Sequence, residues 1–505
     1  MSYNGARLRR LNEKRTASRG EFVLYWMQAY RRLDCNHALD YAIRCAHELE
    51  RPLVVYEGLR LDYPWASRRL HHFVLEGMAA NAEVAKQRGL NYWPFVETKA
   101  EPGRGLLLDL ARRASMVVTD DFPCFIVPRQ SAALARQAEV PVFAVDSNSV
   151  VPLSLLGPAV GAAAHLRPRI HKAFAEAWGH RAARRPRLPA VAAKAVAPPF
   201  APWKRDDLGA FVRGLPLDDT VPPVEAMPGG PAAAGRRLRQ FLGTRLAGYA
   251  ETRSRPTAPG DGRASGLSPY LHFGHISIQE VVEAALETTG RWTPDDLRVH
   301  ARGRREGFFT DDADVNGFLD EAVTWRDVGF QWHWSRRDDT RSLEKALPAW
   351  ALATLRAHGS DKRSFVYSPA EWEAGATHDP LWNAAQRELV ATGTIHNYLR
   401  MLWGKKVLEW SRSPEEAYAT LEHLNNKYAL DGRDPNSYTG ILWCFGLFDR
   451  PWAPERKVLG VLRYMSSENT ARKFKLGAYY EYVNGLPAIE AVRRDGATAG
   501  PSPRP

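Results

Sequence analysis

The chain has 505 residues, of which 45% are hydrophobic and 25% charged, a balance typical of a soluble folded protein with two or three domains. It contains no apolar run of about 18 residues and no apolar segment behind its basic N-terminus, which excludes a membrane-spanning helix and a secretory signal. Four scattered cysteines without a CxxC pair argue against a disulfide or zinc framework, so we expect reduced thiols, no metal and a cytoplasmic location. The formal charge of +12 favours a polyanionic partner such as nucleic acid.

The first 180 residues alternate short apolar runs with amphipathic stretches, which predicts an α/β domain with a doubly wound, parallel, Rossmann-like sheet. A GxGxxG fingerprint does not follow the first predicted strand, so this domain is not expected to bind a dinucleotide in the usual way. The predicted strands are 22–26, 52–59, 91–97, 115–121 and 140–146, and the predicted helices are 34–49, 66–88, 105–113 and 128–138.

The segment 181–231 is rich in Pro, Ala and Arg, which indicates an extended connection between domains. From 232 to 486 the apolar spacing becomes that of helices, which predicts an all-α domain. The tail 487–505 is predicted to be disordered.

The helix predicted around 396–410 has an unusual mixture of side chains. Asn397, Arg400, Trp403 and Trp410 follow one another at spacings of three, three and seven, which places them on or near one face. A charged arginine between tryptophans is odd for a core stripe, although plain packing of the indoles with an exposed Arg400 explains the spacing equally simply.

Downstream, a turn-forming DGRDPNSYTG segment brings Asp431 and Asp434 close to Asn425 in the sequence. One of these carboxylates could pair with Arg400 and fix its guanidinium beside a ligand. A solvated loop capped by Asp and Asn is the competing interpretation.

Two further segments combine polar groups with helix starts. SGLSPYLHFGHIS (265–277) opens a helix with small and hydroxyl residues, which suits a diphosphate but also an ordinary Ser-Pro start. In 316–334, Glu321 and Trp325 are i, i+4 neighbours followed by Arg326, an arrangement that could receive a planar polar substrate or form an ordinary half-buried helix.

Taken together, these segments resemble the photolyase and cryptochrome family, and specifically the class II cyclobutane pyrimidine dimer photolyases. The resemblance runs from YWMQAYRRLDCNHAL (25–39) to RYMSSENTARKF (463–474). It is densest in SGLSPYLHFGHIS, THDPLWNAAQ, HNYLRMLWGKKVLEW, NNKYALDGRDPNSYTG and DRPWAPER. Several long motifs in the right order outweigh the plainer interpretations given above.

The resemblance implies an N-terminal domain that can hold an antenna pigment, a deazaflavin more than a folate, and a helical domain that encloses FAD. It assigns the FAD phosphates to Tyr249, Ser265, Gly266, Leu267 and Ser268. It pairs Arg400 with Asp431 beside the flavin, places Asn425 at the flavin N5, and allows Asn397 to contact FAD or DNA.

The resemblance also implies the reaction: excited, reduced FAD gives an electron to a pyrimidine dimer flipped out of UV-damaged DNA, the ring opens, and the electron returns. Glu321 would bind the base edges of the dimer, and Trp325 and Trp443 would form its apolar walls, with Arg326 next to them. Trp382, Trp403 and Trp410 would relay electrons that reduce FAD under light. Arg450 and Arg463 would grip the strand, and the candidate phosphate contacts are Lys405, Lys406, Arg456 and Lys457. A monomer is expected.

The sequence departs from the family pattern at three places. Asn397 stands where many class II sequences have Gly, TWRDVGFQW replaces an arginine-rich segment, and LGVLRYM lacks a common lysine. The alternatives are a cryptochrome photoreceptor, a photolyase of other lesion preference, and a basic nucleic-acid-binding protein without cofactor. Repair of six-four photoproducts is disfavoured because no histidine pair facing the lesion can be placed.

Overall fold

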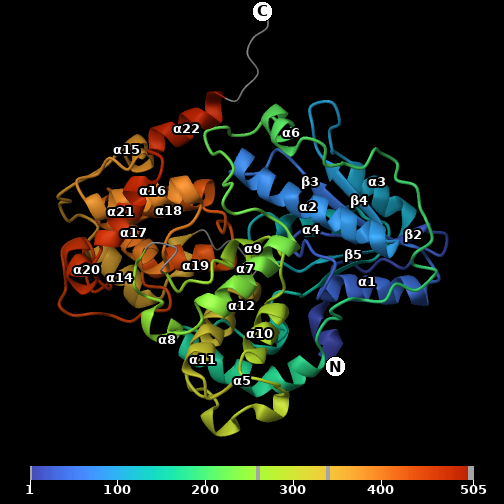
Figure 1. The fold of residues 1–505 in the computed structure, drawn as a ribbon, viewed down its shortest axis with the longest axis horizontal. Coiled ribbons are helices and arrows are strands. Elements are labelled where there is room, and N and C mark those ends of the chain that lie inside the picture. Colours follow the sequence, from blue (N-terminus) through green and yellow to red (C-terminus); the bar gives the residue numbers. More distant parts are fainter. Residues whose placement is uncertain (1–2, 258–261, 337–341, 499–505) are drawn as a thin grey trace, which may run out of the picture.

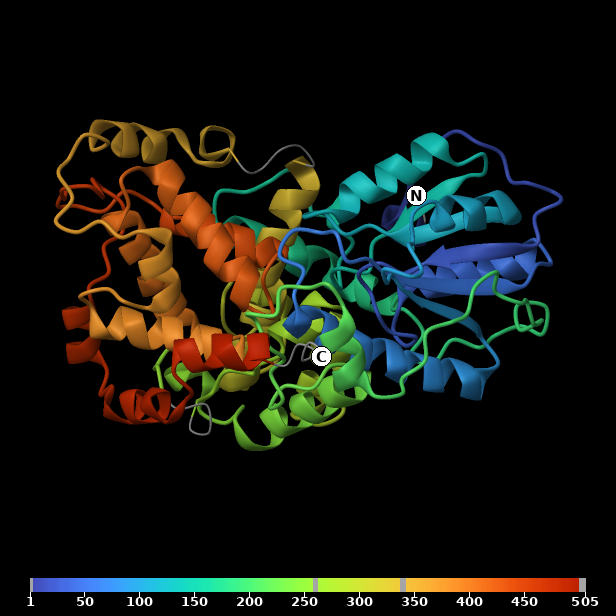
Figure 2. The same ribbon diagram turned by 90° about the horizontal axis from the view of Figure 1, so that it is seen from above.

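A computed structural model describes residues 3–257, 262–336 and 342–498 of the chain. An α/β half built from the N-terminal residues lies beside a helical half built from the C-terminal residues (Figure 1, Figure 2). Within the described ranges, no helix combines the length and apolar character needed to cross a bilayer. All four cysteines are buried and unpaired.

The α/β half contains one sheet with the strand order β1-β6-β5-β2-β3-β4. The pairs from β6 through β4 are parallel, whereas β1 is antiparallel to β6, so the predicted doubly wound parallel sheet is confirmed with one added edge strand. A strand of three residues is too short to show an alternating pattern in the sequence, which is why β1 was not predicted. The strands are β1 (Leu8–Arg10), β2 (Phe22–Trp26), β3 (Leu53–Leu59), β4 (Asn91–Val96), β5 (Ala114–Asp120) and β6 (Val142–Val145).

Both faces of this sheet are covered by helices, because the strands are apolar on both sides. Phe22, Leu24 and Trp26 of β2 pack into one apolar cluster, and Val23 and Tyr25 pack into another, as expected when successive side chains point to opposite faces. The covering helices are α1 (His37–Glu48), α2 (Arg68–Arg88), α3 (Leu106–Arg113) and α4 (Val127–Gln137), which confirms the four predicted ones.

The chain crosses between the halves before residue 180. Helix α5 (Ala163–Gly179) packs on the helical half through a buried ion pair in which Arg167 Nε lies 2.7 Å from Asp320 Oδ1. The segment 181–231 then runs back along the sheet, where the backbone N–H of Leu53 donates to Ala192 O at 3.0 Å. This connection is extended as predicted except for the short helix α6 (Leu208–Gly214).

The helical half begins at α7 and surrounds a second apolar core. The helical character predicted for residues 232–486 is confirmed, and the helix predicted around 396–410 is α17. Its helices are α7 (Pro231–Thr244), α8 (Tyr249–Thr252), α9 (Ser268–His272), α10 (Ile278–Glu287), α11 (Ala313–Leu319), α12 (Arg326–Arg336), α13 (Leu343–Ala346), α14 (Ala349–Ala357), α15 (Pro369–Ala374), α16 (Pro380–Thr392), α17 (Asn397–Trp410), α18 (Pro414–Tyr428), α19 (Pro435–Cys444), α20 (Ser467–Lys473), α21 (Gly477–Gly485) and α22 (Ile489–Thr498), with a π-helical turn η5 (Asp320–Trp325) between α11 and α12.

The prediction of disorder from residue 487 onward is wrong for the first part of the tail. Residues 489–498 form α22, which buries Ile489 and Val492 in the core of the helical half. Arg493 adds an ion pair of 3.0 Å to Glu373 on α15. Two apolar residues three apart are enough to dock a helix turn, although the composition around them is polar. Residues 499–505 lie outside the described ranges.

A single buried arginine of α2 joins the two halves. Arg69 donates from Nη1 to Tyr428 O at 2.7 Å and from Nη2 to Val390 O at 2.6 Å. These carbonyls lie in the last turns of α18 and α16, where backbone acceptors have no partner within the helix and a cation is favoured. Arg69 therefore ties the α/β half to the ends of two helices that precede the candidate site.

The halves also meet through backbone contact at Gly274. This residue has a φ of +68°, and a Cβ built on it would lie 2.1 Å from Ala29 O in the α/β half. The carbonyl of Gly274 accepts from Arg32 Nη1 at 3.0 Å. Only glycine permits both the left-handed backbone and this close approach.

We expect Gly274→Ala to lower the free energy of unfolding by about 2 kcal/mol or more, because it adds backbone strain and a clash with backbone. The matched control is Gly243→Ala in α7, where a Cβ meets nothing within 4 Å and helix propensity should improve stability by up to about 1 kcal/mol. Urea unfolding measures both variants. Equal stability of the two would contradict the close approach.

Candidate functional site

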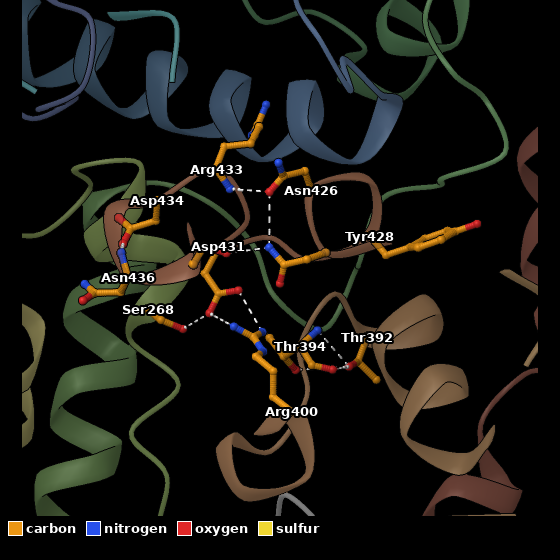
Figure 3. A network of polar contacts seen from close by, with 12 residues as sticks. Ser268, Thr392, Thr394, Arg400, Asn426, Tyr428, Asp431, Arg433, Asp434 and Asn436 are labelled. Atoms are coloured by element: carbon orange, nitrogen blue, oxygen red, sulfur yellow. Dashed lines mark hydrogen bonds and ion pairs between the residues drawn. The ribbon is translucent and has the colours of Figure 1, made fainter. Parts of the chain in front are cut away.

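A partly buried ion pair in the helical half joins Arg400 to Asp431. Arg400 lies in the first turn of α17, and Asp431 lies in the turn between α18 and α19. Arg400 Nη2 donates to Asp431 Oδ1 at 2.9 Å, and Ser268 Oγ donates to Asp431 Oδ2 at 2.7 Å. Figure 3 shows these three side chains converging from three separate segments. The predicted pairing of Arg400 with Asp431 is therefore present.

The pair places a charged carboxylate and an unused guanidinium N–H where water has little access. Burial favours the neutral form of Asp431, but the Arg400 guanidinium and the hydrogen bonds from Arg400 and Ser268 outweigh it and hold the pKa of the carboxyl below its ordinary value. Arg400 Nε is buried and has no hydrogen-bond partner among the described residues. A buried guanidinium nitrogen without an acceptor is costly, so this atom is suited to an acceptor on a ligand.

Asn425 is buried in α18, next to this pair along the chain. Its Nδ2 donates to Ser437 Oγ at 2.5 Å and to Asn426 Oδ1 at 3.2 Å. The Oδ1 of Asn426 also accepts the backbone N–H of Arg433, as Figure 3 shows. No contact within the described residues links Asn425 directly to Arg400 or Asp431, so their meeting around one ligand stays a prediction.

The predicted phosphate loop lies beside an arginine that sequence reasoning missed. Gly266 has a φ of +65°, which glycine adopts without strain, and the carbonyl of Ser265 accepts from Arg237 Nε at 2.8 Å. Leu267 is buried, and Ser268 begins α9. A cation on α7 held against this loop could have been noticed only by pairing two segments about 30 residues apart in the sequence.

Tyr249 lies deeper than a phosphate ligand needs to. Its ring is buried against Phe241 and Phe318, with centroid separations of 5.7 and 5.6 Å. Burial, with the nearby Glu321 carboxylate, raises the pKa of Tyr249. Its contact with the FAD phosphates stays a prediction.

Glu321 sits in the π-helical turn η5, a rare element that often marks functional sites. Its Oε1 lies 2.5 Å from Arg253 Nη2, which leaves the carboxylate partly accessible and directed towards an arginine. Burial raises the pKa of Glu321, although the positive charge of Arg253 opposes that shift. The neighbouring Asp320 faces the other way and binds Arg167.

Trp325, the last residue of this turn, and Arg326, the first residue of α12, lie in different surroundings. Trp325 is 42% exposed, an unusual state for an indole and one that leaves its ring available to a partner. Arg326 turns to the α/β half instead, where Nη1 donates to Asn148 O at 2.6 Å and the guanidinium lies 4.0 Å from the Phe330 ring centroid. These contacts place Arg326 between the two halves, and its role toward the substrate or DNA stays a prediction.

A pocket of about 500 Å³ opens beside Glu321, because its partner Arg253 forms part of the pocket wall. The predicted residues Asn397, Trp443 and Arg463 all line it. None of the described lining residues is acidic, so the wall combines positive charge with aromatic rings. The other cationic and aromatic lining residues are Arg456, Lys473, Tyr398, Trp452 and Tyr464.

The rim of this pocket is held by an ion pair between Arg463 and Asp449. Arg463 makes hydrogen bonds of 2.8 and 3.0 Å to the carboxylate and lies 4.0 Å from the Trp452 ring centroid. Arg450 is exposed, and its guanidinium lies 4.5 Å from the centroid of the same ring. Arg463 therefore lines the pocket and Arg450 contacts a lining residue, so both can meet a phosphate chain.

The lysines predicted to bind phosphate are buried instead. Lys405 is 1% exposed, donates from Nζ to Cys444 O at 2.7 Å, and lies 5.1 Å from the Trp443 ring centroid. Burial lowers its pKa to about 8. Lys406 pairs with Glu409 at 2.8 Å. Lys457 is exposed, and its role stays a prediction.

The three predicted relay tryptophans do not form a continuous row by themselves. Trp403 and Trp382 are stacked with centroids 6.1 Å apart, and Trp382 Nε1 donates to Trp403 O. Trp410 contacts a fourth indole, Trp372, which also contacts Trp382. Sequence reasoning missed Trp372 because it lies on α15, outside the helix pair that carries the other three.

We expect Asp431→Asn to lower the free energy of unfolding by about 3 kcal/mol at neutral pH, because it leaves a buried guanidinium unpaired. The pKa of Asp431 is lowered in the folded state, so its contribution is complete above its ordinary pKa of 3.8 and is lost as pH falls through the folded value. Urea unfolding of both proteins should therefore give a constant difference from pH 7 to about pH 5 and a shrinking one below. If the difference in unfolding free energy vanished between pH 7 and pH 5, burial would outweigh Arg400 and the pKa of Asp431 would be raised.

Comparison with known proteins places this arrangement in a family. No protein-family model matches the chain. The deoxyribodipyrimidine photo-lyase of Methanothermobacter thermautotrophicus is 34% identical over 95% of this chain and 98% of its own length. That of Oryza sativa subsp. japonica is 36% identical over 95% of this chain and 90% of its own.

Other likenesses are weaker. Cryptochrome-1 of Sinapis alba is 29% identical but matches only 34% of this chain. Among solved structures, a bacterial class III photolyase from Agrobacterium tumefaciens shares the fold, with a TM-score of 0.62, 18% identity, and coverage of 94% of this chain and 89% of its own. The identity and coverage shared with the first two relatives show that this chain belongs to the deoxyribodipyrimidine photo-lyase family.

Proposed function

We propose that this protein is a light-driven DNA repair enzyme that splits cyclobutane pyrimidine dimers. The observation that carries the proposal is the pocket beside Glu321, whose wall is positively charged and aromatic and contains no acidic residue among those described. Positive charge attracts the DNA backbone, and aromatic faces receive bases that have left the stack. The names of the full-length relatives support the same activity.

The residues of the helical half fit an FAD. The unpartnered Nε of Arg400 can donate to a flavin acceptor, and the lowered pKa of Asp431 keeps the balancing negative charge in place. Both hydrogen bonds of the Asn425 side chain use Nδ2, so its Oδ1 is available to accept an N–H from a reduced ring. Arg237 adds a cation beside the 265–268 loop, where the diphosphate would bind.

When bound, reduced FAD supplies the light-excited electron that opens the cyclobutane ring and accepts it again afterwards. The protein residues hold the two partners. Glu321 would exchange its contact with Arg253 for the base edges of the dimer, and the raised pKa helps its carboxyl to donate a proton in a hydrogen bond. Trp443 and the exposed Trp325 would cover the apolar ring faces, and Arg463 and Arg450 would hold the strand at the rim.

The finer assignments follow the class II resemblance. We propose a class II enzyme acting as a monomer in the cytoplasm, with a deazaflavin antenna pigment in the α/β half. A six-four preference is disfavoured, because His396 is the one histidine among the described lining residues and both its ring nitrogens contact backbone groups. A cryptochrome role is disfavoured by the presence of Glu321, Trp325 and Trp443, the three residues assigned to the dimer.

The direct test is repair. Purified protein is reduced by light, mixed with DNA that contains thymine dimers, and followed under blue light by the return of base absorbance. Restoration under light and none in the dark supports the proposal. Flavin-containing protein that leaves dimers intact would favour a photoreceptor, and colourless protein that releases no flavin on denaturation would favour a simple DNA-binding protein.

We expect Glu321→Ala to reduce the quantum yield of repair without releasing FAD, because its carboxyl contacts substrate and not the cofactor. Absorbance of bound flavin and the yield per absorbed photon are measured on the same sample. Flavin-free protein would instead assign Glu321 a structural part in the π-helical turn.

We expect Trp403→Phe to slow photoreduction by about tenfold or more, because it removes the first donor of the relay. Repair by the dithionite-reduced variant should fall far less, since that assay bypasses the relay. Equal loss in both assays would contradict the relay assignment of Trp403.

A further inference from the structure

Trp372 fills the space between two members of the proposed relay. Its ring centroid lies 4.9 Å from that of Trp382, with the planes at 59°, and 6.2 Å from that of Trp410, with the planes at 11°. Both separations fall in the range of direct aromatic contact. Trp372 is 2% exposed, so its position is fixed by packing.

Trp382 and Trp410 have no such ring contact with each other in the described part of the chain. Trp403 and Trp410 are separated by about two turns of α17, roughly 10 Å along the helix axis. The rings therefore form one unbroken contact series in the order Trp403, Trp382, Trp372, Trp410.

We propose that Trp372 is a redox-active member of this series, carrying electrons from Trp410 to Trp382 during reduction by light. The inference rests on the proposed function, which requires electrons to reach the centre of the helical half. Electron transfer slows exponentially with the gap between donor and acceptor, so two contacts are favoured over one longer jump. Four like side chains also have similar oxidation potentials, which makes each step nearly neutral in free energy.

The electrons balance at each step. In the flavin-loaded protein Trp403 would give one electron to the excited flavin, which is thereby reduced. Trp403 would then take one electron from Trp382, Trp382 one from Trp372, and Trp372 one from Trp410. A thiol from solution then reduces Trp410. The indole N–H of Trp403 donates to the Gln386 amide oxygen and that of Trp382 to a backbone carbonyl. Neutral oxygens are poor bases, so the oxidised rings keep their protons, and the missing electron (the vacancy) can still pass from one indole to the next.

The test is flash photolysis of the flavin-loaded protein in the presence of dithiothreitol. The tryptophan radical is followed by its own transient absorption, which is separate from repair. We expect Trp372→Phe to shorten the radical lifetime by about tenfold, because the vacancy returns from Trp382 before it can reach Trp410. The matched control is Trp332→Phe, an equally buried indole of the same core that lies outside the series.

A second readout checks the contact itself. The coupled indoles Trp372 and Trp382 should give a paired positive and negative band in near-ultraviolet circular dichroism, lost in Trp372→Phe and kept in Trp332→Phe. Trp372→Tyr serves if the phenylalanine variant fails to fold, since a tyrosine must lose its phenol proton when it is oxidised and should relay electrons less well than tryptophan.

The outcomes distinguish the proposed role of Trp372 from the proposed repair activity. Radical lifetimes that match in Trp372→Phe and Trp332→Phe would overturn the role of Trp372 while leaving the repair proposal standing. Wild-type protein that forms no tryptophan radical would overturn both this inference and the relay on which it rests. Wild-type protein with a long-lived radical but no dimer repair would overturn the repair proposal alone.

Discussion

One partly buried carboxylate sets the geometry of the helical half. Asp431 neutralises Arg400 on α17 and also receives the hydroxyl of Ser268 at the start of α9. A guanidinium away from water is tolerated only with a counter-charge, so α17 cannot be packed in this position unless the turn after α18 is held beside it. Three segments, spread over 163 residues of the chain from Ser268 to Asp431, are thereby fixed by one carboxylate.

The pocket next to this pair follows from the same helices. Asn397 lies at the start of α17 and Trp443 near the end of α19, and the turn that carries Asp431 joins α18 to α19. Fixing the ion pair therefore also fixes the distance between the pocket wall and the place where a cofactor would lie. A reaction that transfers electrons over short range needs a fixed distance between cofactor and substrate. The helices that carry the ion pair and the pocket wall would set that distance.

Much of this could be predicted from the sequence because it is carried by local patterns. The five buried strands and the helices α1 to α4 have clear periodicities, and the pairing of Arg400 with Asp431 followed from the family motifs. The surroundings of Arg326 and Lys405 could not be predicted, because a cation in the sequence does not say whether its partner is a carbonyl of another segment or solvent. Helix α22 could not be predicted because only two apolar residues dock it in a polar segment. Arg237 and Trp372 were missed for the related reason that each acts across elements distant in sequence.

The arginine of α2 that reaches Tyr428 O and Val390 O has a consequence for dissection of the molecule. A C-terminal fragment expressed without the first 180 residues would present two frayed helix ends, at the very points from which the site-bearing turns depart. Conversely, the N-terminal fragment would lose both acceptors of Arg69 and expose apolar surface that the helical half covers. We therefore expect each piece to be less stable alone than with the other, so that co-expression of the two is the arrangement that this interface favours.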